Sequence, residues 1–112
     1  MRSEITYNLQ ASITMLATGK GGRKKPVITG YRPSLVFNTN RNYSCEIELL
    51  DKKELNPGES AAVYIKLLPA RTIPKNLRIN DSFTLSEGNR AVGYGIIINE
   101  VVKKENAVEE VI

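Results

Sequence analysis

Hydrophobic and polar residues alternate along the start of the chain with the period of a β-strand. Apolar side chains stand at every second position, with Thr, Asn, Gln and Ser between them: Ile5, Tyr7, Leu9, Ala11, Ile13 and Met15. This period places one set of side chains on each face of a strand, and Ile and Thr favour the pleated conformation. The pattern predicts a long first strand near residues 5–17, which Gly19, Gly21 and Gly22 end.

The same period returns in later segments that are separated by turn residues. Residues 43–50 alternate again, and further strands are expected over residues 31–38, 60–68, 80–86 and 90–102. Pro33 interrupts the 31–38 segment and should place it at a sheet edge or a bulge, because proline lacks the backbone donor. Asn56-Pro57-Gly58 predicts a turn, and Glu87-Gly88-Asn89 predicts a hairpin between the last two strands.

Six short strands without a convincing amphipathic helix predict an all-β domain. The expected architecture is an antiparallel barrel or sandwich that forms a single domain over residues 1–102. Residues 103–112 are expected to be a short, flexible tail in which an isolated helical turn would be unstable. Gly93 and Gly95 lie two positions apart in the last strand and leave one of its faces without side chains. This arrangement suits a barrel corner or a close approach of two backbones.

Composition narrows the class of protein. A chain of 112 residues with 41% hydrophobic and 25% charged residues is an ordinary single domain. No apolar run approaches the roughly 20 residues that span a bilayer, and the first ten residues lack the apolar core of a signal peptide. A cytoplasmic location without membrane contact is therefore expected. Histidine is absent and Cys45 is the single cysteine, so no Ser–His–Asp or Cys–His site and no cysteine-built metal site is expected.

Two features that invite an enzymatic interpretation have simpler explanations. Glu46 and Glu48 fall on one face of a strand, as solvent-facing glutamates commonly do. The run Gly19-Lys20-Gly21-Gly22-Arg23-Lys24-Lys25 lacks the spacing of a phosphate-binding loop, and no helix follows it. We therefore expect no catalytic residues, no nucleotide, no cofactor and no metal. Cys45 is expected to be a small buried hydrophobic residue.

Charge is distributed unevenly along the chain, whose net charge is +4. Glu4 and Glu46 bracket a stretch with no acidic residue and with these basic ones: Lys20, Arg23, Lys24, Lys25, Arg32 and Arg41. Such an excess is typical of a surface that meets phosphates or an acidic partner. The same residues are equally compatible with solubilising loops. Both interpretations remain open on charge alone.

Several separated motifs resemble those of a known family. Gly21-Gly22-Arg23, then Pro26, then Gly30-Tyr31-Arg32-Pro33 is similar to the segment that opens the third, C-terminal domain of bacterial elongation factor Tu. The similarity continues through Phe37, Thr39, the Ile47-Glu48-Leu49 strand, the Pro57-Gly58 turn and Arg90-Ala91-Val92-Gly93-Tyr94-Gly95. In this order, the motifs cover about residues 9–101. The resemblance implies a six-stranded antiparallel β-barrel and, without the GTPase domain, no GTP chemistry.

The resemblance also implies where a partner would bind. In the family this barrel contacts the T-stem of aminoacyl-tRNA through phosphates and riboses, and it also contacts the nucleotide exchange factor. Carried over by position, and joined by the basic residues nearby, the expected RNA- or partner-binding residues are Arg23, Lys24, Lys25, Arg32, Ser34, Arg41, Ser44, Glu87 and Asn89. Family members usually have Gln where Ser34 stands and Gly where Asn89 stands. Arg32 has a second interpretation, in which its guanidinium positions neighbouring groups of the barrel itself.

Two classes of function follow. The first is a non-catalytic binding module whose basic 20–41 face contacts tRNA or ribosomal RNA through phosphate and 2′-hydroxyl groups. The second is a protein-interaction module that imitates the third barrel and engages a translation-factor-binding protein. Its partner would be an exchange factor, a toxin or the GTPase domain, in a decoy or immunity role. The first class predicts affinity that falls steeply with salt, and the second does not.

Overall fold

Nearly all of the regular structure is β-strand, as the alternating pattern predicts. The computed structural model describes residues 3–37, 41–68 and 77–106. Within them the elements are β1 (Ser3–Met15), the 3-10 helix η1 (Thr18–Lys20), β2 (Val27–Ile28), β3 (Ser34–Val36), β4 (Asn42–Leu49), β5 (Glu54–Leu55), β6 (Ser60–Leu67), β7 (Ser82–Glu87) and β8 (Arg90–Asn106). No helix in these ranges is long and apolar enough to cross a bilayer.

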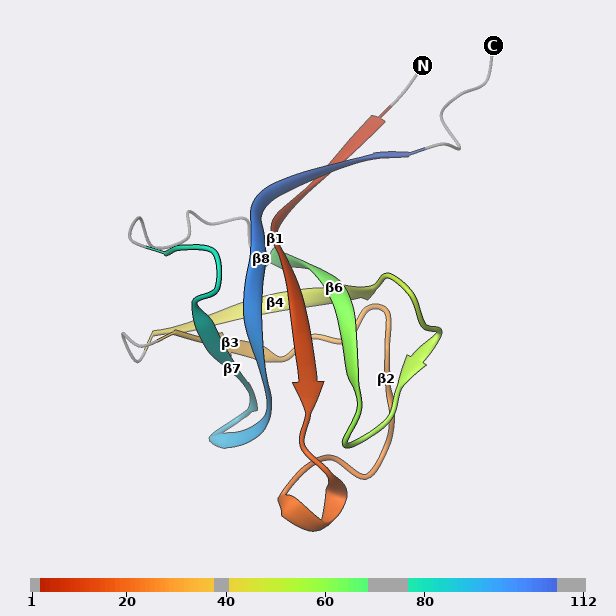
Figure 1. The fold of residues 1–112 in the computed structure, drawn as a ribbon, viewed down its shortest axis with the longest axis vertical. Helices are drawn as coiled ribbons and strands as arrows, with labels where there is room; N and C mark the ends of the chain where they lie inside the picture. The colour runs from red at the N-terminus through yellow and green to blue at the C-terminus, as the bar shows by residue number, and fades with distance from the viewer. Residues whose placement is uncertain (1–2, 38–40, 69–76, 107–112) are drawn as a thin grey trace.

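Six of the strands close into an antiparallel barrel (Figure 1). Around the barrel the order is β1-β6-β4-β3-β7-β8, and β8 pairs back onto β1. Closure removes the unpaired strand edges that an open sheet would present. Beyond the barrel, β1 and β8 continue as a two-stranded ribbon in which Ser3 pairs with Asn106 (Figure 1). The six-stranded barrel expected from the sequence is confirmed.

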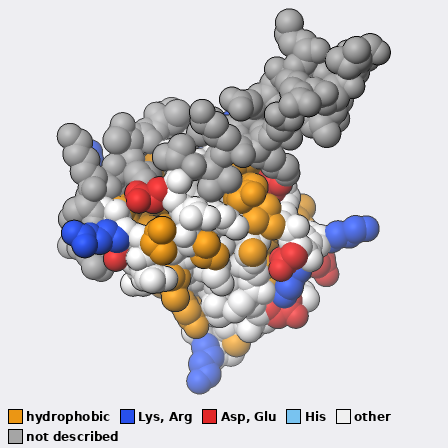
Figure 2. Space-filling model, turned by 45° about the horizontal axis from the view of Figure 1, so that its top comes forward, with side chains coloured by type: hydrophobic (Ala, Val, Ile, Leu, Met, Phe, Trp, Pro, Cys, Tyr) orange, Lys and Arg blue, Asp and Glu red, His pale blue; other side chains and the backbone are white. Residues whose placement is uncertain are grey.

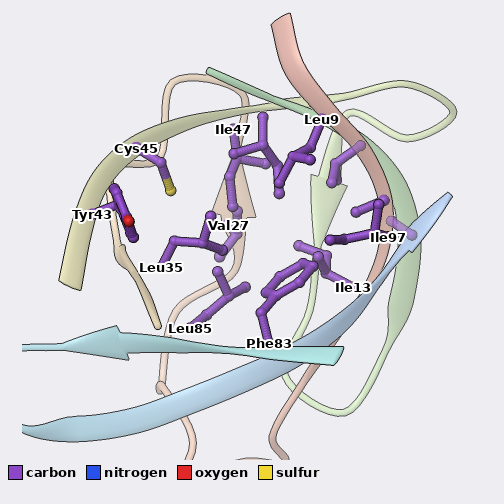
Figure 3. Close-up of a cluster of buried hydrophobic side chains, with 14 of the residues drawn as sticks. Leu9, Ile13, Val27, Leu35, Tyr43, Cys45, Ile47, Phe83, Leu85 and Ile97 are labelled. Atoms are coloured by element: carbon purple, nitrogen blue, oxygen red, sulfur yellow. The ribbon is translucent and has the colours of Figure 1, made fainter. Parts of the chain in front are cut away.

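The inward side chains form one continuous hydrophobic core. Alternate residues of β1 from Leu9 to Met15 and of β4 from Tyr43 to Leu49 are buried, as their patterns predict. Figure 3 shows several of them pointing into the barrel, Leu9 and Ile13 of β1 and Tyr43, Cys45 and Ile47 of β4, together with Phe83 and Leu85 of β7. Cys45 is fully buried, and burial raises the pKa of its thiol to about 12. It behaves as the small buried hydrophobic residue that the sequence predicts.

The two glycines of β8 let this strand lie close to β1, and Gly95 also makes room for the ring of Phe83. A methyl group on Gly95 would lie 2.4 Å from Cζ of Phe83 and 2.8 Å from the carbonyl oxygen of Ser12. A methyl group on Gly93 would lie 2.8 Å from the carbonyl oxygen of Thr14. The close approach predicted for these two positions is therefore confirmed.

Several expected boundaries were wrong. The 31–38 strand is reduced to β3, and this strand lies between β4 and β7 rather than at an edge. Pro33 stands immediately before β3, where its missing donor costs no ladder hydrogen bond. The last strand continues to Asn106, so the start of the expected tail is strand; residues 107–112 lie outside the described residues.

A small second sheet was not predicted. Val27 of β2 pairs with Leu55 of β5, and Ile28 pairs with Glu54. Val27 and Leu55 are buried and belong to the barrel core, as Figure 3 shows for Val27. The two strands are too short for an alternating pattern to reveal them. They fix the chain that follows the basic segment 23–25 against the body of the domain.

Candidate nucleic-acid interface

The basic segment 23–25 is held close to the end of β1 by a tight turn. Gly21 has a φ of 89°, and the amide of Gly22 donates to the carbonyl of Ala17 at 3.0 Å. A methyl group on Gly22 would lie 2.0 Å from the carbonyl oxygen of Leu16, so only glycine permits this approach. Thr18 Oγ1 donates to the carbonyl of Arg23 at 2.7 Å. The two glycines quoted for the family motif thus position the arginine that follows them.

Arg23 is oriented by a carboxylate and a phenol from other parts of the chain. Its Nη1 donates to Oε2 of Glu87, which ends β7, and its Nε donates to the carbonyl of Lys25 at 3.3 Å. The hydroxyl of Tyr31 donates to the same Glu87 oxygen at 2.5 Å. The guanidinium carbon lies 4.7 Å from the centre of the Tyr31 ring, within the range of a cation–π contact. Three segments of the chain therefore meet at this cluster: residues 23–25, Tyr31 and the end of β7.

The pKa values of the cluster reflect these contacts. Burial alone would raise the pKa of the Glu87 carboxyl, but hydrogen bonds from Tyr31 and Arg23 and the charges of Arg23 and Arg90 lower it overall. Burial and the bond to Glu87 raise the pKa of the Tyr31 phenol. For Arg23, burial opposes the charged form, but the bonds to Glu87 and Tyr31 raise its pKa. At neutral pH the cluster is an ionised guanidinium–carboxylate pair with a neutral phenol.

A shallow hollow of about 260 Å³ opens beside this cluster. Its lining consists of four cationic side chains and one carboxylate: Arg23, Lys24, Lys25, Arg90 and Glu87. Lys24, Lys25 and Arg90 are exposed, whereas Arg23 is partly buried. The side chains that line the hollow carry a formal charge of +3, because four are positive and one is negative. A concave surface with this charge attracts anions. We call it the basic hollow.

The structure brings four predicted site residues together at the basic hollow and adds one that was missed. Arg23, Lys24, Lys25 and Glu87 were expected, and Arg90 was not. Arg90 pairs with Glu87 across the β7–β8 hairpin, in the register that the Glu87-Gly88-Asn89 turn fixes. The turn signal could therefore have placed Arg90 beside Glu87. Asn89 is exposed in the turn itself, next to Arg90.

Ser34 and Ser44 lie in a row of hydroxyl groups that crosses three strands. Ser34 of β3 pairs with Ser44 of β4 on one side and with Ser86 of β7 on the other. All three side chains reach the surface of the barrel. Ser86 directly precedes Glu87 in β7, so the serine row lies one residue along the strand from a residue that lines the basic hollow.

Two predicted arginines lie elsewhere. Nη2 of Arg32 is 3.2 Å from Oε1 of Glu46; the Arg32 side chain is 69% exposed and that of Glu46 is 37% exposed. The positioning interpretation of Arg32 agrees with this pair, although an exposed pair contributes little stability. Arg41 lies over the ring of Tyr43, 5.9 Å from its centre. Within the residues described, no three Cys, Asp or Glu side chains gather as a metal site would require.

Fold and surface together define a small, closed β-barrel domain with an anion-attracting hollow at the β7–β8 hairpin. Residues 4–101 match the family described as the elongation factor Tu C-terminal domain. The chain belongs to this family, and the resemblance inferred from its motifs is confirmed. The family is a non-catalytic barrel domain of a translation factor.

Proposed function

We propose that this barrel binds structured RNA, either tRNA or ribosomal RNA, with the basic hollow as its phosphate-binding surface. The observation that carries the proposal is the convergence of Arg23, Lys24, Lys25 and Arg90 around one shallow concavity. Contacts from such groups to phosphate oxygens supply most of the affinity for nucleic acid and fix its position.

Arg23 is prepared for a phosphate by the contacts that hold it. Bonds to Glu87 and to the carbonyl of Lys25 use two of the five guanidinium N–H donors. The remaining donors sit in a fixed orientation, so little side-chain entropy is lost when they bind. Lys24 and Lys25 are exposed and act as point charges beside it.

The serine row favours RNA, rather than any other polyanion, as the ligand of this surface. A hydroxyl group both donates and accepts, as does the ribose 2′-hydroxyl. Ser34, Ser44 and Ser86 form one outward-facing row across β4, β3 and β7, and Ser86 is next in the chain to Glu87 of the basic hollow. An RNA backbone whose phosphates occupy the hollow would present riboses to this row. Such contacts read the shape of an RNA helix rather than its sequence.

The experiment is a binding titration of labelled tRNA by fluorescence anisotropy at low salt. The wild-type chain is compared with the double variant Lys24→Glu/Lys25→Glu and with Lys52→Glu/Lys53→Glu. The second pair of lysines is also exposed and does not line the basic hollow, so both variants change the net charge equally. We expect binding to be lost in the first variant and kept, with a reduction of only a few-fold, in the second. Equal losses in both, or no binding by the wild type, would refute the proposal.

A further inference from the structure

The cations of the basic hollow converge, whereas the negative charges of an RNA backbone are spread out. The lining side chains carry a formal charge of +3 around one concavity of about 260 Å³. A nucleic-acid strand carries one negative charge per nucleotide, so several nucleotides are needed to balance that charge. A small anion with several negative charges would balance it from within the hollow. The surface is therefore suited to a second kind of ligand, which is compact and highly charged.

The volume of the hollow matches the size of a diphosphate. About 260 Å³ corresponds to roughly nine water-sized atoms at about 30 Å³ each. Inorganic pyrophosphate, with two phosphorus and seven oxygen atoms, is of this size, and phosphate or sulfate is about half as large. Pyrophosphate also carries about three negative charges at neutral pH, because phosphate oxygens ionise below or near that pH. Its charge therefore balances that of the lining.

The lining side chains divide between one fixed donor and three that can adjust. Arg23 is held by its bond to Glu87, and its remaining N–H donors suit phosphate oxygens. Lys24, Lys25 and Arg90 are exposed and can turn toward an anion in the hollow. The carboxylate of Glu87 accepts two hydrogen bonds at one oxygen, which offsets its repulsion of an anion. The single negative side chain of the lining thus leaves room for a negative ligand.

The donors to such an anion are side chains and not backbone amides. The glycine-rich turn before the basic segment uses its own amides, since those of Lys20, Gly21 and Gly22 all donate to carbonyls within the turn. Among the described residues, all those that line the hollow are charged, and a nucleotide base would meet no apolar wall there. The hollow is therefore suited to the anionic group of a ligand rather than to an attached nucleoside.

The opposite situation is found on the face of the molecule that Figure 2 shows. Uncharged side chains, orange and white, occupy the middle of that view, and blue Lys and Arg side chains lie toward its edges. A multivalent anion would meet no group of cations in the middle of this face. The basic hollow brings such a group together.

We propose that the basic hollow binds a free diphosphate group, and that this ligand competes with RNA for the same cations. Binding of the diphosphate stands by itself, whereas the competition rests on the proposed function. The concentration of small phosphate anions would then regulate how much of the barrel is bound to RNA.

The first test is a titration of the isotope-labelled chain with sodium pyrophosphate, without RNA or divalent cations, followed by nuclear magnetic resonance. We expect a dissociation constant of about 1 mM, since each exposed charge pair is weak. The shifted amides should be those of residues 23–25 and 87–90. Sulfate at equal ionic strength should bind at least about 5-fold more weakly, because it is smaller and less charged. Equal affinity for sulfate and pyrophosphate would overturn the proposal.

Matched variants assign the binding to the hollow. Lys24→Gln/Lys25→Gln should weaken pyrophosphate binding at least about 10-fold, because it removes two of the four cations. Lys52→Gln/Lys53→Gln removes the same charge from exposed lysines outside the hollow and should change the affinity less than about 2-fold. The spectra also show whether each variant is folded. Equal losses in the two variants would refute a site at the hollow.

A nucleoside diphosphate is a second source of the same group. ADP should bind with an affinity similar to that of pyrophosphate, because the lining gives its base nothing to pack against. Much tighter binding of ADP would contradict the assignment to the bare diphosphate group.

Competition is measured by tRNA anisotropy. Pyrophosphate at about five times its dissociation constant should weaken tRNA binding about 6-fold relative to sodium chloride at the same ionic strength. Binding of both ligands without competition would contradict a shared site. Binding of pyrophosphate without any binding of tRNA would refute the proposed function and leave the diphosphate site standing, and binding of tRNA alone would do the reverse.

Discussion

The phenol of Tyr31 donates a hydrogen bond of 2.5 Å to the carboxylate of Glu87. The bond joins the segment before β3 to the end of β7, residues that are 56 positions apart in the chain. Because Arg23 donates to the same carboxylate oxygen, Glu87 also holds the basic segment against the barrel. Glu87 thus stabilises the fold, although it lies in a hollow whose other charged side chains are all positive.

Replacing Glu87 with Gln should separate the contribution of this carboxylate to stability from its effect on RNA binding. The neutral amide weakens both hydrogen bonds, and we expect the free energy of unfolding to fall by about 1 kcal/mol for this partly exposed cluster. Removing a negative charge from the basic hollow should raise RNA affinity several-fold at low salt, up to roughly 10-fold. Urea unfolding and tRNA anisotropy titrations measure the two quantities.

Glu46→Gln is the control for Glu87→Gln, since Glu46 pairs with the exposed Arg32 away from the basic hollow. It should change stability by no more than about 0.5 kcal/mol and raise RNA affinity less than Glu87→Gln does. A loss of RNA affinity in Glu87→Gln would mean that the carboxylate itself contacts the ligand.

The contribution of Glu87 to stability should depend on pH. Its pKa is lowered from the usual 4.5 in the folded chain, so the ionised form is favoured by folding. A lowered carboxyl pKa stabilises the fold above the unfolded-state pKa, and this contribution is lost as the pH falls through the folded-state value. The stability difference between wild type and Glu87→Gln should therefore be constant near pH 7 and shrink below about pH 4.5. A difference that grows on acidification would contradict this assignment.

Gly95→Ala should destabilise the barrel by about 1–3 kcal/mol, because the added methyl group has no space. It would meet the ring of Phe83 in the core and the backbone of Ser12 on β1. Thermal unfolding followed by circular dichroism measures the change. Gly19→Ala is the control, since a methyl group there would contact nothing within 4 Å. Similar melting temperatures for Gly95→Ala and the wild type would show that β8 can move away from the ring.

The barrel could be predicted from the sequence because its long strands repeat their pattern over many residues. Alternation in β1, β4 and β6 follows burial on one face, and the turn residues at Pro57-Gly58 and Gly88-Asn89 stand where the strands reverse. The pairs Val27–Leu55 and Ile28–Glu54 could not be predicted this way, because a strand of two residues has no period. The edge position predicted for the 31–38 strand was wrong, because a proline directly before a strand looks the same in the sequence as a proline in an edge strand.

The candidate site was predicted only in part because sequence identifies charge but not its neighbours. The motif placed Arg23, Lys24 and Lys25 together, and they do line one hollow. Glu87 and Tyr31 hold Arg23, and Glu46 pairs with Arg32. Both sets of contacts form only when the barrel brings distant segments of the chain together.

The salt dependence of tRNA binding tests the central claim most directly. Arg23 is already paired with Glu87, so the counterions that RNA releases come from Lys24, Lys25 and Arg90. The logarithm of the association constant should therefore fall against the logarithm of salt with a slope of about −2.7. Affinity would then drop roughly 40-fold between about 50 and about 200 mM salt. In Lys24→Gln/Lys25→Gln the slope should be about −1, whereas Lys52→Gln/Lys53→Gln should leave it at about −2.7. A wild-type slope near zero, or one that the first pair of substitutions leaves unchanged, would contradict phosphate binding at this surface.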